Sequence, residues 1–266
     1  MAVDKIIMWD KNYQRPALLE LVTLAAELTK DEYGSYLIEP SIEMEQGRAF
    51  AQLTHNQDVN LVIGGVDKER ERTARTIYFP LSRGLLGFRL CLINESKPNI
   101  FYNLESVKDF KKASLTIGLG THWPDRKIIE SNGLQTMPSP VSSSLIDMLS
   151  AHRFDCFLRS IGEVEYELKT YADRQVMLDE HIAFIYPFAN FIFINPANER
   201  LHERLRKGLL LASKNNKFNQ HFNKHYRNLL YTYKLYERKL FFLKNPNLSE
   251  KASNAINQYG IASFTN

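Results

Sequence analysis

The sequence lacks the long apolar segment that a membrane-spanning helix needs, since it contains no run of about 18 consecutive apolar residues. Its start, Met1-Ala2, leads directly into a strand-like stretch and has neither the basic nor the apolar region of a secretion signal. Two interpretations stay open: a cytoplasmic protein, or a secreted protein whose signal has been replaced by Met1-Ala2.

Cysteine is scarce as well. The chain has two, Cys91 and Cys156, and each lies within an apolar, strand-like run. We interpret both as small buried side chains in preference to a disulfide or a nucleophile. Two cysteines do not decide the redox compartment.

The chain also has little excess charge of either sign, because 34 Lys and Arg are balanced by 30 Asp and Glu, which gives a formal net charge of +4. So small and dispersed an excess does not favour nucleic acid as a partner. Basic residues become denser between residues 200 and 238, but they alternate there with apolar residues at helical spacing. This pattern is typical of a solvated helix face.

Signatures of catalysis are missing too. There is no G-x-S-x-G motif and no Cys/His nucleophile signature, and no Lys-Ser/Thr pair follows Gly118 and Gly120 as it does in a phosphate-binding loop. From the histidines we expect no metal site, and we expect no cofactor.

What the chain does contain is enough apolar sequence, 44% of 266 residues, for one large core or two modest ones. Short strands alternate with helices in the first half, which predicts a parallel sheet, and a similar alternation begins after residue 94. We predict strands at residues 5–9, 36–38, 59–66, 90–93, 116–119, 154–158, 182–186 and 191–194, and helices at residues 15–33, 44–53, 104–110, 124–131, 142–152 and through most of 199–236.

The segment T-I-G-L-G-T-H-W-P-D, residues 116–125, ends a buried strand and opens a helix. Pro124 suits the first helical position and Asp125 suits the first turn. The free N–H groups of a helix start bind anions, and Thr121, His122 and Trp123 lie beside this one. The alternative is an ordinary turn in which Thr121 caps the helix.

The order of these modules resembles that of the extracytoplasmic solute-binding proteins of bacterial amino-acid transporters. The matching segments are residues 47–66, Glu71-Arg72 before Phe79-Pro80-Leu81, residues 104–110 followed by I-G-L-G-T, and residues 144–158. The resemblance implies the type II periplasmic binding protein fold: two α/β lobes of mixed sheets flanked by helices, joined by two crossover hinge strands. Residues 1–91 and 188–248 would form lobe 1, residues 92–187 lobe 2, and residues 249–266 a weakly ordered tail.

The resemblance also assigns a ligand site between the lobes. Arg89 would grip a ligand carboxylate, with Arg83 as a rival, because a guanidinium fork suits a carboxylate. Thr121 would complete this clamp from the opposite lobe. Tyr13 would cover the ligand, or else belong to the core.

One position departs from that family, because Ser160 stands where an Asp usually binds the α-amino group, and Arg159 precedes it. Asp67, next to the loop at Gly65, or Glu163 would then substitute; otherwise the ligand is not a plain amino acid. Arg89, Arg159 and His122 around a helix start favour an anionic or dicarboxylic solute.

By this resemblance the chain is a non-catalytic, monomeric, periplasmic protein that holds a small carboxylate-bearing solute for an ABC-type transporter. Its macromolecular partner would be a membrane permease or sensor that recognises the ligand-bound form. Two alternatives stay open: a lyase or dehydratase that uses His122 or Glu163 as acid or base, and the ligand-sensing domain of a larger receptor.

Overall fold

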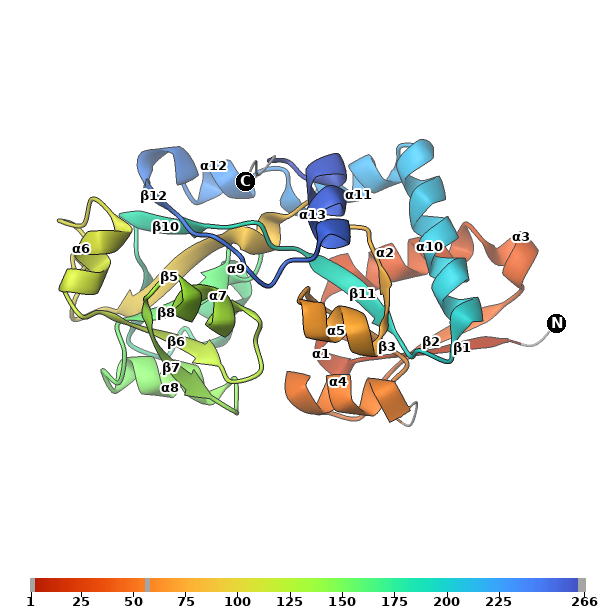
Figure 1. Ribbon diagram of the computed structural model, residues 1–266, viewed down its shortest axis with the longest axis horizontal. Coiled ribbons are helices and arrows are strands. Elements are labelled where there is room, and N and C mark those ends of the chain that lie inside the picture. The colour runs from red at the N-terminus through yellow and green to blue at the C-terminus, as the bar shows by residue number, and fades with distance from the viewer. Residues whose placement is uncertain (1–2, 56–57, 263–266) are drawn as a thin grey trace. The chain divides into compact units, whose positions relative to one another are not determined.

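The computed structural model describes residues 3–55 and 58–262 (Figure 1). The chain divides into two compact units. The first comprises residues up to Arg83, Ala189–Arg227 and the stretch from Ser249, and the second comprises Gly84–Phe188 and Asn228–Leu248. Each unit has its own sheet and its own core, and each is described here by itself.

The first unit is built on a five-stranded sheet in the order β2-β1-β3-β11-β4. Strand β1 (Asp4–Met8) runs parallel to β2 (Tyr36–Pro40) and to β3 (Leu61–Gly65). Strand β11 (Asn190–Ile194) is antiparallel to both β3 and β4 (Arg75–Ile77). The helices of this unit are α1 (Asp10–Tyr13), α2 (Pro16–Glu27), α3 (Lys30–Tyr33), α4 (Gln46–His55), α5 (Lys68–Thr73), α10 (Glu199–Lys214), α11 (Lys217–Tyr226) and α13 (Glu250–Tyr259).

The second unit is built on a seven-stranded sheet in the order β12-β10-β5-β8-β6-β7, with β9 paired to β5. Strand β6 (Thr116–Gly120) is parallel to β7 (Gln135–Ser139) and β8 (Cys156–Ser160). Strand β5 (Phe88–Asn94) is antiparallel to three neighbours. The remaining elements are β9 (Val176–Leu178), β10 (Ile182–Ile185), β12 (Lys239–Phe242), α6 (Val107–Lys112), α7 (Asp125–Ser131), α8 (Ser144–Ser150), α9 (Val164–Thr170), α12 (Leu229–Thr232) and the 3-10 turns Leu85–Gly87 and Leu235–Glu237.

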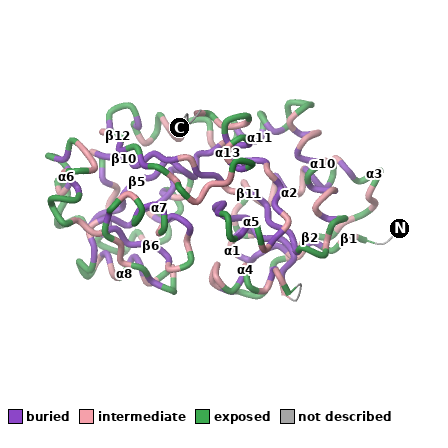
Figure 2. Tube along the Cα trace, viewed as in Figure 1, coloured by how far each residue is buried: buried purple, intermediate pink, exposed green. Residues whose placement is uncertain are grey.

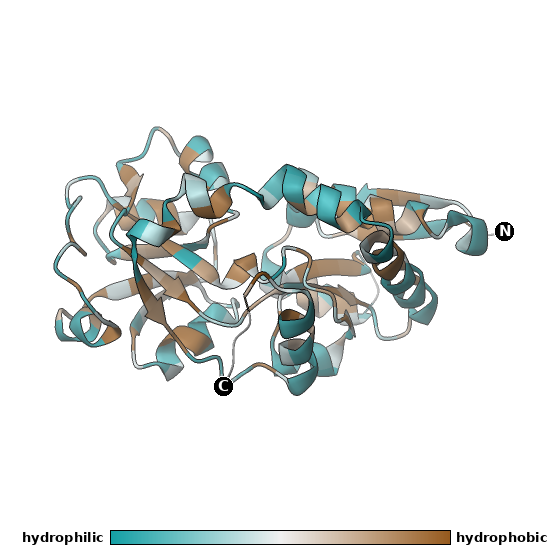
Figure 3. Ribbon diagram, turned by 90° about the horizontal axis from the view of Figure 1, so that it is seen from above, coloured by the Kyte–Doolittle hydropathy of each residue, from teal (hydrophilic) through white to brown (hydrophobic). Residues whose placement is uncertain are grey.

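Mixed sheets flanked by helices confirm the predicted α/β class. Strands β3, β5, β8 and β10 are buried along their whole length, while much of the helical ribbon is hydrophilic (Figures 2 and 3). Where α2 and α10 cross, Gly208 has no room for a side chain, because a Cβ there would lie 2.0 Å from the carbonyl oxygen of Ala25. Within the described residues, the structure has no helix both long and apolar enough to cross a membrane.

Two predicted helices are divided in the structure. The helix expected at residues 15–33 becomes α2 and α3, separated at Leu28–Thr29, where Thr29 Oγ1 bonds back to the Ala25 carbonyl. The helical stretch expected from residue 199 is interrupted at Asn216, whose φ of 65° is left-handed and incompatible with a continuing α-helix.

The cysteine interpretation is wrong, because Cys91 and Cys156 form a disulfide. They lie on the adjacent strands β5 and β8, which pair antiparallel at the centre of the second sheet, so their side chains meet although 65 residues separate them. Both are fully buried, as expected. The apolar run around each cysteine indicated that the side chain is buried, but it did not indicate the disulfide partner.

The units also differ from the lobes proposed from the sequence. The first unit ends before β5, because β5 pairs with β8, β9 and β10 of the second sheet. Residues 228–248, assigned to lobe 1, belong to the second unit, where β12 pairs with β10. In place of a weakly ordered tail, Glu250–Tyr259 is a helix of the first unit, capped by Ser249 and packed through Tyr259 against Phe79.

Candidate functional site

A cluster of charged side chains is buried in the second unit. Arg89 on β5 and Arg159 on the adjacent β8 supply two guanidinium groups. Three carboxylates pair with them: Asp125 in the first turn of α7, Glu163 just before α9, and Glu167 within α9. Buried charges persist only when they are paired in this way.

Arg89 has a partner for each nitrogen of its guanidinium. Its Nη2 forms an ion pair with Asp125, its Nη1 lies 3.5 Å from Glu163 Oε2, and its Nε donates to the Tyr186 hydroxyl at 3.1 Å. That hydroxyl donates in turn to Asp125 Oδ1 at 2.6 Å. Burial alone would lower the pKa of Arg89, but the negative charges of Asp125 and Glu163 raise it above its usual value. Arg89 is therefore a permanent cation that the chain itself neutralises.

Arg159 is enclosed by carboxylates and aromatic rings. Its Nη2 lies 2.6 Å from Glu167 Oε1 and 3.4 Å from Glu163 Oε2. Its guanidinium carbon lies 4.9 Å from the ring centroid of Trp123, which stacks on Phe157. The indole fits because Gly120 has no side chain: a Cβ there would lie 2.5 Å from the Trp123 ring.

Ser160 and Glu163 close the turn that follows β8. Ser160 donates its hydroxyl to the Leu85 carbonyl at 3.2 Å and its backbone N–H to Glu163 Oε2 at 3.2 Å. The Glu163 side chain is 26% exposed, whereas those of Asp125 and Glu167 are 5% and 9% exposed. Glu163 is thus the carboxylate through which this cluster meets solvent.

The predicted clamp between Arg89 and Thr121 needs correction. Both residues belong to the second unit, so they do not lie on opposite lobes. Asp125 lies in the first turn of α7, and its carboxylate pairs with Arg89. Thr121 does not cap α7, because Pro124 is the N-cap and no side chain caps it; the Thr121 backbone N–H donates to Ser139 at 2.8 Å. His122, the next residue after Thr121, is exposed.

The remaining predicted site residues belong to the first unit, where each has a structural role. Tyr13 packs against the hydrophobic core, and the Gly65 carbonyl accepts from Arg70 Nη1 at 2.7 Å. Asp67 caps α5 by accepting the Arg70 backbone N–H at 2.8 Å. Arg83 lies over the rings of two α11 residues, Phe218 and Phe222, and donates to Asn219.

The sequence reading missed the partners that complete the cluster. The sequence marks Asp125 as a helix-start residue only, and it gives Glu167 and Tyr186 no functional role. Spacing gave one usable signal: Glu163 and Glu167, four residues apart at the start of a helix, occupy one face. Tyr186 follows a buried strand and carried no signal of its own.

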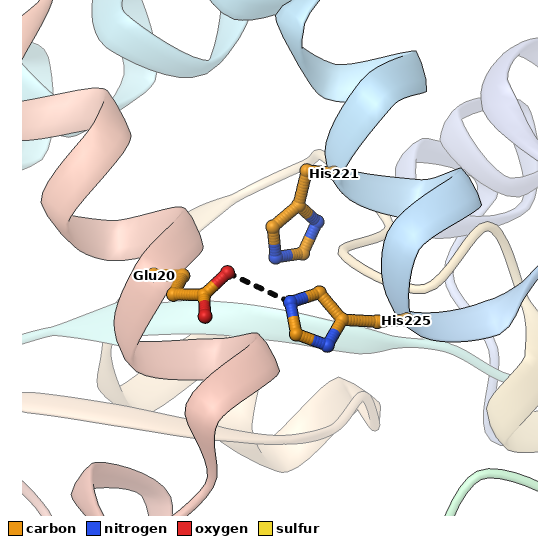
Figure 4. A group of neighbouring side chains, drawn as sticks. All are labelled: Glu20, His221 and His225. Atoms are coloured by element: carbon orange, nitrogen blue, oxygen red, sulfur yellow. Dashed lines mark hydrogen bonds and ion pairs between the residues drawn. The ribbon is translucent and has the colours of Figure 1, made fainter.

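A second group that sequence reading missed lies in the first unit and consists of Glu20 on α2 and His221 and His225 on α11 (Figure 4). The signal was present, because His221 and His225 form an H-x-x-x-H pair that the expectation of no metal site overlooked. One donor atom from each residue lies within 4.8 Å of the others.

No protein-family model and no curated protein matches this sequence. Solved structures do match its fold. An ancestral arginine-binding protein bound to arginine has a TM-score of 0.60 at 14% identity and covers 85% of this chain and 99% of its own. A periplasmic His/Glu/Gln/Arg/opine family-binding protein from Silicibacter pomeroyi in complex with lysine has a TM-score of 0.61 at 8% identity over 84% and 97%.

A histidine kinase sensor domain with similarity to periplasmic binding proteins matches as well, with a TM-score of 0.60 at 12% identity over 84% of this chain and 96% of its own. Identities this low establish the fold alone. The matching structures confirm the fold that the order of sequence modules implied: this chain has the fold of the periplasmic amino-acid-binding proteins.

Proposed function

We propose that this chain is a non-catalytic solute-binding protein that serves an ABC-type transporter. The observation that carries the proposal is the extent of the shared fold. Amino-acid-binding proteins align over 95–100% of their own length with 84–85% of this chain. Several of them hold arginine, lysine or glutamine. Proteins of this kind act by binding and releasing a small solute, for which a fold of two compact units is suited.

The disulfide supports a location outside the cytoplasm. Disulfides persist in oxidising compartments such as the bacterial periplasm and are rare in cytosolic proteins. Cys91 and Cys156 are bonded and fully buried, so their bond is a structural one. We therefore propose a periplasmic protein that meets a membrane permease in its ligand-bound form, and we retain a monomer as the proposed state.

The charged cluster bears on the identity of the bound solute. The sequence suggested a carboxylate-bearing solute, and the pairing of charges in the cluster favours a different one. Two guanidinium groups face three carboxylates there, so an added anion meets no excess of positive charge. We propose that Asp125 occupies on Arg89 the place that a ligand carboxylate would take. The cargo is then an amino-acid derivative or related small solute that is recognised through groups other than a free carboxylate.

Screening purified protein tests this proposal. Calorimetry and thermal-shift measurements against amino acids, organic acids and their amides should find a solute that binds at one site, with the amide bound at least as tightly as the matching acid. Asp125→Asn frees Arg89 and should reverse that preference. If no solute of any of these classes binds, the proposed function is wrong. If the acid binds best to the unaltered protein, only the proposal about Asp125 is wrong.

A sensor domain is the second candidate, because a histidine kinase sensor domain and the GluR0 ligand-binding core share the fold. The binding chemistry would be the same and the partner would differ. The complete gene separates the two, since an encoded membrane or kinase segment favours the sensor. An enzyme would instead convert its bound solute, and conversion abolished by His122→Ala with binding retained would favour it over both.

A further inference from the structure

Glu20, His221 and His225 bring three metal-binding side chains together on two helices of the first unit. His221 and His225 lie one turn apart on α11, so both imidazole rings project from the same face. Glu20 faces them from α2, about 200 residues earlier in the chain. In Figure 4 one ring nitrogen of each histidine points toward the Glu20 carboxylate.

Hydrogen bonds and burial act on Glu20 and on His221. Hydrogen bonds from Lys224 and His225 lower the pKa of Glu20 to about 2, so its carboxylate is ionised. His221 is 7% exposed, and burial lowers its pKa, which favours the neutral imidazole that binds metals. Its Nε2 lies 2.7 Å from the Ala17 carbonyl, and its Nδ1 is buried without a hydrogen-bond partner among the residues that the structure describes.

We propose that Glu20, His221 and His225 form a binding site for one divalent transition-metal ion of the Zn²⁺ class. Two imidazole nitrogens and a carboxylate oxygen are a donor set that Zn²⁺ accepts, with water in the remaining position. Zinc lies about 2.0–2.2 Å from such donors, so any two of them stand no more than about 4.4 Å apart. The present donor atoms lie within 4.8 Å of one another, which is close to this limit.

Lys224 is the natural competitor for this site. Its Nζ lies 2.9 and 2.8 Å from the two carboxylate oxygens of Glu20, and its side chain is 62% exposed. A metal ion must displace this ammonium, which swings into solvent at little cost. This competition separates a metal site from an ordinary ion-pair network: removing Lys224 weakens the network but strengthens metal binding.

Zinc titration of the tag-free, chelator-treated protein tests the site, with calorimetry against a competing chelator as the measurement. We expect one Zn²⁺ per chain and a rise in the unfolding temperature, since an ion that joins α2 to α11 binds only the folded state. Glu20→Gln and His225→Ala should each weaken binding by at least about tenfold, and Lys224→Met should strengthen it. His55→Ala, which removes an exposed histidine of the same unit, should leave it unchanged.

His221→Ala should also abolish stoichiometric binding, but this variant removes a buried side chain, so its folding is checked by circular dichroism. Glu20→Gln and His225→Ala change less buried side chains, so they keep the test decisive if His221→Ala fails to fold. The proposal is overturned if the unaltered protein takes up no stoichiometric Zn²⁺, if Glu20→Gln and His225→Ala bind it as tightly as the unaltered chain, or if Lys224→Met binds it more weakly. None of these results bears on solute binding, which is measured separately.

Discussion

Asp125 is the buried acid partner of Arg89, although the two residues lie 36 positions apart in sequence and on different elements. Arg89 comes from the central strand β5, and Asp125 from the first turn of α7. Tyr186 binds both of them, so three segments of the second unit meet at one hydrogen-bonded group. The resemblance to solute-binding proteins assigns Arg89 to ligand binding, whereas in this chain Arg89 forms an internal ion pair.

Removing this acid should destabilise the second unit strongly. Asp125→Ala leaves the buried Arg89 without its main counter-charge, and breaking such a pair costs about 3–5 kcal/mol. We expect this loss in the free energy of unfolding by urea, followed through Trp123, which lies in the same unit. Glu39→Ala, which breaks the exposed pair with Lys5, should cost less than about 1 kcal/mol. Equal losses in the two variants would show that the Arg89–Asp125 pair is not a buried one.

The disulfide should contribute a large part of the stability of the second unit. It closes a loop of 65 residues, and the chain-entropy model gives about 4 kcal/mol for a loop of this length. The double variant Cys91→Ala/Cys156→Ala should therefore unfold at lower urea concentration, with the Trp123 signal affected more than that of Trp9 in the first unit.

Alkylation of the unreduced, denatured protein provides the direct check on that bond. We expect no uptake of iodoacetamide without reductant and two additions per chain after reduction, read by mass spectrometry, because both cysteines are bonded. Two additions before reduction would contradict the disulfide and remove its support for a periplasmic location.

Gly208→Ala should destabilise the first unit. The added methyl group meets the backbone of Ala25 at the crossing of α2 and α10, and overpacking of this kind costs about 1–3 kcal/mol. The matched exchange Gly47→Ala, at a half-exposed position of α4, should be neutral or slightly stabilising because alanine favours helix. Urea unfolding followed through Trp9 measures both. A stabilised Gly208→Ala protein would mean that the two helices do not pack this closely.

Asp10→Asn should stabilise the protein at neutral pH and lose that advantage in acid. Burial raises the pKa of Asp10 above 3.8, against the lowering effect of hydrogen bonds from the backbone of Met44 and Lys11. A raised native pKa means that the charged form opposes folding, and this cost disappears as the pH falls through the native pKa toward 3.8.

The measurement is the difference in unfolding free energy between Asp10→Asn and the unaltered chain from pH 7 to pH 3. We expect a positive difference at pH 7 that shrinks toward zero at the acid end. Asp31→Asn, at an exposed position of the same unit, serves as the reference. A difference that grows as the pH falls would have the wrong sign and would contradict a raised pKa.

Local sequence determined most of the helices and strands and, through their order, the fold. Alternating apolar runs and helix starts are short-range patterns, and each records burial and capping at its own position. Pro124-Asp125 correctly located the start of α7, and β1, β3, β6 and β11 lie within two residues of their predicted bounds. Weakly apolar elements such as β7 and α9 gave no such pattern and were missed.

Tertiary structure alone decided which side chains meet. The partner of Arg89, the partner of Cys91, the helix that faces His221 and His225, and the unit to which residues 228–248 belong all depend on pairings between distant segments. A residue's own neighbourhood in the sequence reports that it is buried or charged, but not what lies opposite. That is fixed by strand order and helix packing, which place residues tens to hundreds of positions apart within contact distance.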